Sequence, residues 1–365
     1  MNISGIIVEY NPFHNGHLRH IELTKEMTQC DLLIAIVSGN FCQRGDVSIL
    51  NKFEKTEIAL NHGIDLVVEL PYIYTLQNAT VFGYRSVEIL NALGINNLVF
   101  GSESNNLEEL KKMASLSINI DHLKEIMSSG LSYPKSYGLL ASALYPNDIL
   151  AVSYLRAIEQ FKDIKAISID RNSNYHDTTL NNICSASAIR LAILNGQDYS
   201  KATDATIKDP HFLSELYPYL RRILLTHDKN QLHDIFLVSE GIENLMIKNA
   251  LKYESFEDFL NNTISRRYTK ARVQRTIINI MLQIKKKTVN SLSKLNYIRV
   301  FGFNEKGQSF LRNFHNEDYR IVTQFKNIPD DYKDIEWKAS CLYSTLLKKP
   351  NDYLKQELKG PVIIK

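Results

Sequence analysis

Two histidines that flank a glycine are the residues of this chain best suited to chemistry. The segment His14-Asn15-Gly16-His17 follows an apolar run, Ile3 to Glu9, which predicts a strand, and a helix is expected to start near His17. The first turn of a helix offers free N–H groups and a positive dipole end, both of which stabilise an anion. The two imidazoles add hydrogen-bond donors, and Gly16 lets a phosphate approach the backbone. Phosphoryl and nucleotidyl transfer need mainly charge neutralisation and alignment, so the pattern predicts such chemistry with His14 and His17 as catalytic residues.

The elements that would position these residues alternate along the first half of the chain. Short β-branched runs and helical patterns follow one another there, which is typical of a parallel sheet built from βαβ units. The predicted strands are Ile3 to Glu9, Leu32 to Val37, Asp65 to Leu70, Asn97 to Phe100 and Lys165 to Ile169. The predicted helices are Leu18 to Met27, Lys52 to Leu60, Gln77 to Leu93, Asn106 to Met113, Tyr133 to Leu144 and Ile149 to Phe161. Such sheets bind ligands at their strand-to-helix turns, so the site is expected there.

The second half of the chain has a different pattern. After about residue 205 helical periodicity replaces the strand pattern, no βαβ unit is evident, and Leu295 to Gly302 is the one further candidate strand. A chain of 365 residues is longer than single hydrophobic cores usually reach. We therefore predict an α/β, Rossmann-like domain with a parallel sheet and a nucleotide site over residues 1–205, and a mainly helical, basic domain over residues 206–365.

Charge is unevenly divided between the two halves. The whole chain carries +3, but residues 201–365 carry about +9 and residues 1–200 about −6. Between Ser265 and Arg299 there is no Asp or Glu, while apolar residues recur at helical spacing from Val273 to Ile284. One face of that helix is expected to pack and the other to follow a phosphate backbone, although an ordinary solvated face is the alternative. The predicted RNA-binding residues are Arg266, Arg267, Lys270, Arg272 and Arg275. Tyr268 and Tyr297 are candidates for stacking on bases, although aromatic residues more often belong to the core.

Composition excludes several classes of protein. The apolar runs are shorter than the roughly 18 to 20 residues of a membrane span, and the N-terminus lacks the features of a secretory signal, so a cytoplasmic protein is expected. The four cysteines are far apart, which argues against a zinc site or a disulfide scaffold. No metal-ligand cluster is predicted.

Several segments resemble one known family. The segments that carry the resemblance are Gly5 to His17, Ser38 to Asp46, Glu69 to Pro71, Phe100 to Glu103, Pro146 to Leu150, Tyr175-His176-Asp177 and Ser185 to Arg190. The first is similar to the His-x-Gly-His motif of the class I nucleotidyltransferase superfamily. Together, and in this order, they resemble the bacterial tRNA(Met) cytidine acetate ligase family.

The resemblance implies an enzyme that uses ATP to convert acetate into acetyl-adenylate, with release of pyrophosphate. It further implies transfer of the acetyl group to N4 of the wobble cytidine of elongator tRNA(Met). Carried over to this sequence, the ATP-binding residues are Ile7, Val8, Glu9, Tyr10, Asn11, Pro12, Phe13, His14, Asn15, Gly16, His17, Leu18, Arg19, His20, Gly101, Asn147 and Arg171. Ser187 and Arg190 are candidate phosphate-binding residues, and Mg²⁺ is expected to accompany the ATP phosphates.

Other interpretations stay open at this point. Gly101, Asn147 and Arg171 also suit a turn glycine, a helix cap and a surface ion pair, and Ser185 suits a helix N-cap. The segment from Ser38 to Asp46 suits an acetate or cytosine pocket or a plain surface loop, with Cys42 a candidate acyl carrier. His176-Asp177 could deprotonate the attacking amine or form a structural hydrogen bond.

Three other functions compete with the ligase. The first is an adenylyltransferase for a small phosphorylated metabolite. A class I aminoacyl-tRNA synthetase is disfavoured because a Lys-Met-Ser-Lys-Ser-like loop is not found. A non-catalytic RNA-binding protein is disfavoured because His14, Gly16 and His17 are all present.

Overall fold

The computed structural model describes residues 1–116, 145–161, 163–171, 182 and 184–365. Across these residues the strands form one eight-stranded sheet of order β5-β4-β1-β2-β3-β6-β7, with β8 beside β6. The strands are β1 (Ile3–Val8), β2 (Leu32–Ser38), β3 (Leu66–Leu70), β4 (Asn97–Ser102), β5 (Lys165–Asp170), β6 (Tyr297–Phe303), β7 (Arg320–Val322) and β8 (Val362–Ile363). The predicted helix over residues 133–144 and the His176-Asp177 pair lie outside the described residues.

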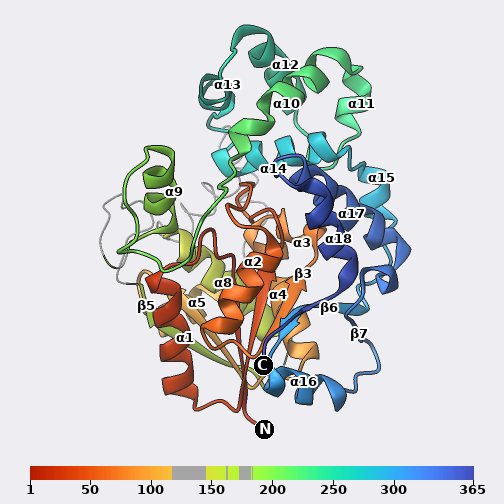
Figure 1. Ribbon diagram of the computed structural model, residues 1–365. Coiled ribbons are helices and arrows are strands. Elements are labelled where there is room, and N and C mark those ends of the chain that lie inside the picture. The colour runs from red at the N-terminus through yellow and green to blue at the C-terminus, as the bar shows by residue number, and fades with distance from the viewer. Residues whose placement is uncertain (117–144, 162, 172–181, 183) are drawn as a thin grey trace.

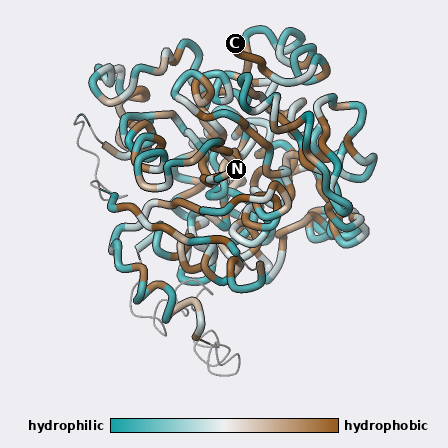
Figure 2. The backbone as a smooth tube through the Cα atoms, turned by 90° about the horizontal axis from the view of Figure 1, so that it is seen from below, coloured by the Kyte–Doolittle hydropathy of each residue, from teal (hydrophilic) through white to brown (hydrophobic). Residues whose placement is uncertain are grey.

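The first five strands form a parallel sheet that is buried on both faces. Along β2, Leu32, Ile34 and Ile36 join one hydrophobic cluster and the alternate residues join another. This alternation arises because successive side chains of a strand point to opposite faces. Helices α1 (Asn15–Thr28) and α2 (Lys52–Asn61) supply side chains to one cluster, and α4 (Ala79–Ala92) and α8 (Pro146–Ile158) to the other. In Figure 2 the hydrophobic stretches accordingly concentrate in the middle of the molecule.

The sheet continues into the second half of the chain, which the sequence pattern only partly predicted. The candidate strand near residues 295–302 is confirmed as β6, but it runs antiparallel to β3, with a register shift between Val67 and Val68. Strand β7 pairs parallel with β6 across helix α16 (Glu305–Arg312), so a βαβ unit does occur after residue 205, contrary to our expectation. The pattern was missed because β7 has only three residues, too few to show a period.

The remaining helices pack largely at the carboxyl end of the strands. They are α3 (Tyr72–Thr75), α5 (Leu107–Ser115), α9 (Ala186–Leu194), α10 (Tyr217–Thr226), α11 (Lys229–His233), α12 (Ile242–Lys252), α13 (Phe256–Thr263), α14 (Lys270–Leu282), α15 (Lys286–Asn290), α17 (Asp330–Ser344) and α18 (Pro350–Lys359). Figure 1 shows α10 to α13 at the end of the molecule opposite both termini, with α14 between them and the sheet.

The α/β fold with a parallel sheet and a mainly helical C-terminal part is thus confirmed. Buried residues of α10, α12 and α14 belong to the same hydrophobic cluster as one face of the sheet. The division into domains at residue 205 stays a prediction, and both the sheet and this cluster cross it.

Candidate active site

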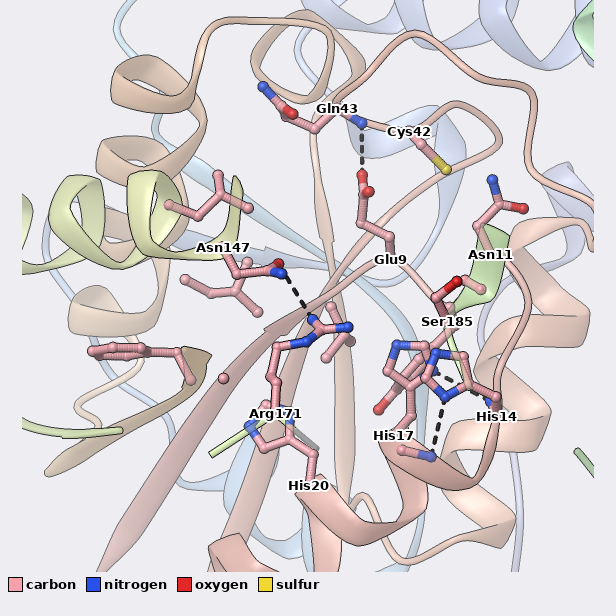
Figure 3. Close-up of a pocket in the computed structure, with 18 of the residues that line it drawn as sticks. Glu9, Asn11, His14, His17, His20, Cys42, Gln43, Asn147, Arg171 and Ser185 are labelled. Carbon is pink, nitrogen blue, oxygen red and sulfur yellow. Dashed lines mark hydrogen bonds between the residues drawn. The ribbon is translucent and has the colours of Figure 1, made fainter. Parts of the chain in front are cut away.

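A crevice lies at the carboxyl edge of the sheet, where β1, β4 and β5 end and α1, α8 and α9 begin (Figure 3). The predicted residues that line it are Ile7, Val8, Glu9, Tyr10, Asn11, His14, Gly16, His17, Arg19, His20, Gly101, Asn147, Arg171, Ser187 and Arg190. Four residues of the predicted ATP-binding segment, Pro12, Phe13, Asn15 and Leu18, are not among its lining residues. Phe13 is buried in the core instead, and Asn15 donates its side-chain amide to Asn182 and to the Lys201 carbonyl.

The turn between β1 and α1 holds both histidines through its backbone. His14 is the N-cap of α1, and its Nδ1 accepts the N–H of Gly16 at 3.1 Å. His17 Nδ1 in turn accepts the N–H of His14 at 3.3 Å, and the two rings stack with centroids 3.8 Å apart. The helix starts at Asn15, slightly earlier than expected, because the imidazole takes the place of the usual Ser or Asp cap.

Both imidazoles are uncharged donors in this arrangement. Burial and the nearby Arg171 and Arg190 guanidinium groups lower the pKa of His14 to about 3. Burial, then His14 and Arg171, lowers the pKa of His17 well below its usual value, and burial lowers that of His20 to about 4. A neutral ring whose Nδ1 accepts a hydrogen bond carries its proton on Nε2. His14 and His17 therefore each retain one Nε2–H donor at neutral pH.

The opposite wall of the crevice is built around Asn147 and Arg171. Arg171 Nη1 donates to Asn147 Oδ1 at 3.2 Å, and Glu103 accepts from both the backbone N–H and the side-chain amide of Asn147. Gly101 leaves room for this arginine, because a Cβ there would lie 2.9 Å from Arg171 Cγ. The glycine thus accommodates a neighbouring side chain of the protein itself.

Ser187 and Arg190, the candidate phosphate-binding pair, lie on α9 and bond to each other. Arg190 Nη2 donates to Ser187 Oγ at 2.9 Å, and its Nη1 donates to the Asn11 carbonyl at 2.7 Å. Ser185 is the N-cap of α9, because its side chain accepts from the N–H of Ala188. These bonds fix the guanidinium beside the first turn of α1.

The segment from Ser38 to Asp46 forms part of the crevice wall. Within it we define the crevice loop as residues 41–47, whose ends are joined by a bridge between Phe41 and Val47. The Gln43 N–H donates to Glu9 Oε1 at 2.6 Å. Lys55 is buried below the loop, and its Nζ donates to the Glu9, Ser38 and Gly39 carbonyls at 3.0, 2.8 and 2.7 Å. Lys55 therefore joins the ends of β1 and β2.

Cys42 does not suit the part of an acyl carrier. The thiol is buried, and burial followed by the Glu9 carboxylate raises its pKa. Only a thiolate is an efficient nucleophile, and this thiol stays protonated.

The predicted RNA-binding residues differ in exposure. Arg266, Arg267 and Lys270 are exposed at the start of α14. Arg272 is mostly covered and bonds Glu240 and Ser239, and the half-buried Arg275 donates to the Gln43 carbonyl. The polar face expected on this helix is partly buried, since Asn279 is fully covered.

The interpretation that Tyr268 and Tyr297 stack on RNA bases is wrong. Tyr297 is buried in the core. Tyr268 is also buried, and its hydroxyl donates to the Glu240 carbonyl. Both are core aromatics, the more frequent role of such residues.

Metal-binding side chains do not cluster in the part of the chain that the structure describes. In the crevice, a Mg²⁺ ion that arrives with ATP would take its ligands mainly from the phosphate oxygens and water. Among the described residues, no helix is long and apolar enough to cross a membrane.

The sequence and fold match known proteins over all or nearly all of their length. A family model described as HIGH Nucleotidyl Transferase matches residues 1–357. The tRNA(Met) cytidine acetate ligase of Oceanobacillus iheyensis is 35% identical, with both chains covered completely. The enzyme of the same name from Fusobacterium nucleatum is 34% identical over 92% of each chain. The chain belongs to the tRNA(Met) cytidine acetate ligase family.

Solved structures agree with this membership. The apo crystal structure of Thermotoga maritima TmcAL superimposes with a TM-score of 0.88 at 27% identity, over the whole of both chains. The same protein bound with alpha-thio ATP superimposes with a TM-score of 0.85. The α/β nucleotidyltransferase fold of the family is thus the fold of this chain.

Sequence reasoning gave no role to three residues that support the crevice from behind its lining. Glu103 and Asp148 connect β4 and α8 reciprocally, because Glu103 accepts the Asp148 N–H and Asp148 accepts the Glu103 N–H. Glu103 lies three residues after the predicted strand from Asn97 to Phe100 and directly after the observed β4, which was an available signal. Lys55 lies in the middle of a helical pattern, and nothing in the pattern sets it apart.

Proposed function

We infer that this protein is an ATP-dependent tRNA(Met) cytidine acetate ligase. It activates acetate as acetyl-adenylate and acetylates N4 of the wobble cytidine of elongator tRNA(Met). The membership of the family supports the substrates, and the neutral imidazole pair at the start of α1 supports the chemistry. Since tRNA, ATP and acetate occur together in the cytoplasm, we place the enzyme there.

The first step takes place in the crevice. An acetate oxygen attacks the α-phosphorus of ATP, the bond to the β-phosphate oxygen breaks, and pyrophosphate leaves with the electron pair. The positive dipole end of α1 and the Nε2–H donors of His14 and His17 stabilise the negative charge that develops on the phosphates. Ser187 and Arg190 bind the departing phosphates, and Asn147 and Arg171 hold the nucleotide on the opposite wall.

The second step consumes the adenylate. The cytidine N4 attacks the acetyl carbon, AMP leaves, and N4 loses a proton to give N4-acetylcytidine. An adenylate must be kept from water until the amine arrives. The crevice loop, which contributes Cys42, Gln43, Arg44 and Asp46 to the lining, is the element we propose for this task.

The acceptor RNA is bound by the exposed cations before and at the start of α14. We propose Arg266, Arg267 and Lys270 as its phosphate contacts, with Arg272 at the edge of this surface. Arg275 is directed to the crevice loop and is not among these contacts.

The decisive test follows labelled acetate into bulk bacterial tRNA, with and without ATP, and ends in nucleoside analysis. ATP-dependent label in N4-acetylcytidine is expected, and it should disappear in the His14→Ala variant while tRNA binding persists. Unlabelled tRNA, together with pyrophosphate exchange that depends on a phosphorylated metabolite, would instead identify an adenylyltransferase.

The RNA surface is tested separately by salt dependence. Replacing Arg266, Arg267 and Lys270 by Gln should reduce the slope of log affinity against log salt by about 0.7 to 0.9 per lost phosphate contact. The matched control replaces Lys25, Lys306 and Arg312, three exposed cations of α1 and α16. An equal change in both variants would contradict the proposed surface.

A further inference from the structure

The crevice loop is pressed against the backbone of α14. Gly45, at the tip of the loop, has a φ of +82°, a conformation that L side chains rarely adopt. A Cβ at this position would lie 2.3 Å from Arg275 N and 2.6 Å from the Gln274 carbonyl carbon. The loop and the helix therefore meet backbone to backbone, and neither can move closer to the other.

Two side chains of α14 add polar contacts to the loop. Arg275 Nη1 donates to the Gln43 carbonyl at 3.1 Å, and Gln274 Nε2 donates to Asp46 Oδ1 at 3.0 Å. Gln274 is buried and Arg275 half-buried. Burial, then Arg272 and Arg44, lowers the pKa of Arg275 to about 10, which leaves the guanidinium protonated at neutral pH. Arg275 thus remains a charged donor to the loop.

The loop passes these contacts on to the crevice. Gln43, held by Arg275 through its carbonyl, donates its own N–H to Glu9 Oε1. Asp46, held by Gln274, lies 3.9 Å from Arg190 Nη2. The path from α14 therefore ends on the Glu9 carboxylate (Figure 3) and on the Arg190 guanidinium, and both residues line the crevice.

We propose that Gln274 and Arg275 are positioning residues of the adenylation site, which hold the crevice loop against Glu9 and Arg190, rather than contacts of the RNA. This proposal rests on the proposed function, because it concerns the ATP-dependent step. It follows that two adjoining segments have separate tasks. Residues 266–270, which lead into α14, face the RNA. The following turn of α14, with Gln274 and Arg275, supports the loop.

The test separates the ATP step from RNA binding. Arg275→Met should lower kcat/KM for acetate-dependent ATP–pyrophosphate exchange about tenfold, the cost of one charge-assisted hydrogen bond, with tRNA affinity and its salt slope unchanged. Arg275→Lys, which keeps a cationic donor, should restore part of the rate. Gln274→Ala should shift the same parameters without any change of charge.

The matched control is Arg221→Met on α10, since Arg221 is likewise a partly buried arginine that donates to a backbone carbonyl, that of Ala250, rather than to the loop. It should leave the exchange rate unaltered. Thermal unfolding of every variant excludes a general loss of fold. A fall in tRNA affinity for Arg275→Met with normal exchange would overturn the proposal. Failure of the unmodified protein to catalyse any acetate-dependent exchange would instead refute the proposed function, and calorimetric ATP binding by the Arg275 variants would still report on the loop.

Discussion

Lowering the pH from 7.5 to 5 should leave His14 uncharged, although an ordinary imidazole gains its proton over that range. The pKa of His14 is lowered to about 3 by burial and by two guanidinium groups. At pH 5 about one molecule in a hundred would then carry the proton, against about 97% for a ring with a pKa of 6.5. The Nε2–H donor that the mechanism needs is therefore present across the whole range.

Side-chain nitrogen NMR of the ¹⁵N-histidine-labelled protein measures this directly. The His14 resonances, assigned by comparison with His14→Asn, should stay those of a neutral Nε2–H tautomer down to pH 5. The same chain unfolded in urea gives the reference titration. A midpoint above pH 5 for His14, or a proton on Nδ1, would refute the assignment of the ring as a neutral donor.

Two substitutions connect this charge state to catalysis. His14→Ala removes both the acceptor for the Gly16 N–H and the donor to the phosphates, and should cost about 10² to 10³ in kcat for pyrophosphate exchange. His14→Asn keeps a carbonyl acceptor and an N–H donor, so it should retain part of that rate. Equal rates for Asn, Ala and the unmodified protein would remove His14 from the reaction.

Three further outcomes are expected. The pKa of His20 is lowered to about 4 from its ordinary 6.5, so its stabilising contribution is complete above pH 6.5 and is lost as the pH falls from 6.5 to 4. At pH 5 the loss is about 2 kcal/mol. The decrease in unfolding free energy between pH 7 and 5 should therefore be smaller by about 2 kcal/mol in His20→Gln. Gly101→Ala should displace the Arg171 side chain and weaken ATP binding several-fold by calorimetry, with an unchanged melting temperature; unaltered affinity would contradict this role. Lys55→Met leaves three carbonyls unpaired and should destabilise the fold by about 3 kcal/mol or more in denaturant titrations, whereas a neutral effect would show that water replaces the ammonium group.

Much of the crevice could be predicted from sequence because its parts are local. A strand, a turn and a helix start within twenty residues of one another around His14 and His17. The resemblance to the family implied Gly101 and Arg171, and both follow predicted strands whose carboxyl ends necessarily meet at one edge of the sheet. Within the segment from Ile7 to His20, however, the pattern could not distinguish lining residues from Phe13, whose ring turns into the core.

The role of α14 shows where the pattern fails. Charge and periodicity predicted one packing face and one RNA face, and treated Arg266 and Arg275 alike. The structure exposes the first and directs the second to Gln43, some 230 residues earlier in the chain, a partner that no local pattern indicates.

The sequence by itself thus determined the local framework: the strands and helices of the first half, the anion-binding turn at His14, and the uneven charge of the two halves. Tertiary structure alone decided which cations stay exposed. Arg299 ends the stretch from Ser265 that has no Asp or Glu. It is buried because the antiparallel strand β6 pairs with β3, and it bonds Glu69 and Glu357. Lys52 lies in the same cluster, 2.7 Å from Glu357. Buried charges require partners of opposite sign, and here those partners come from distant segments that only the folded chain brings together.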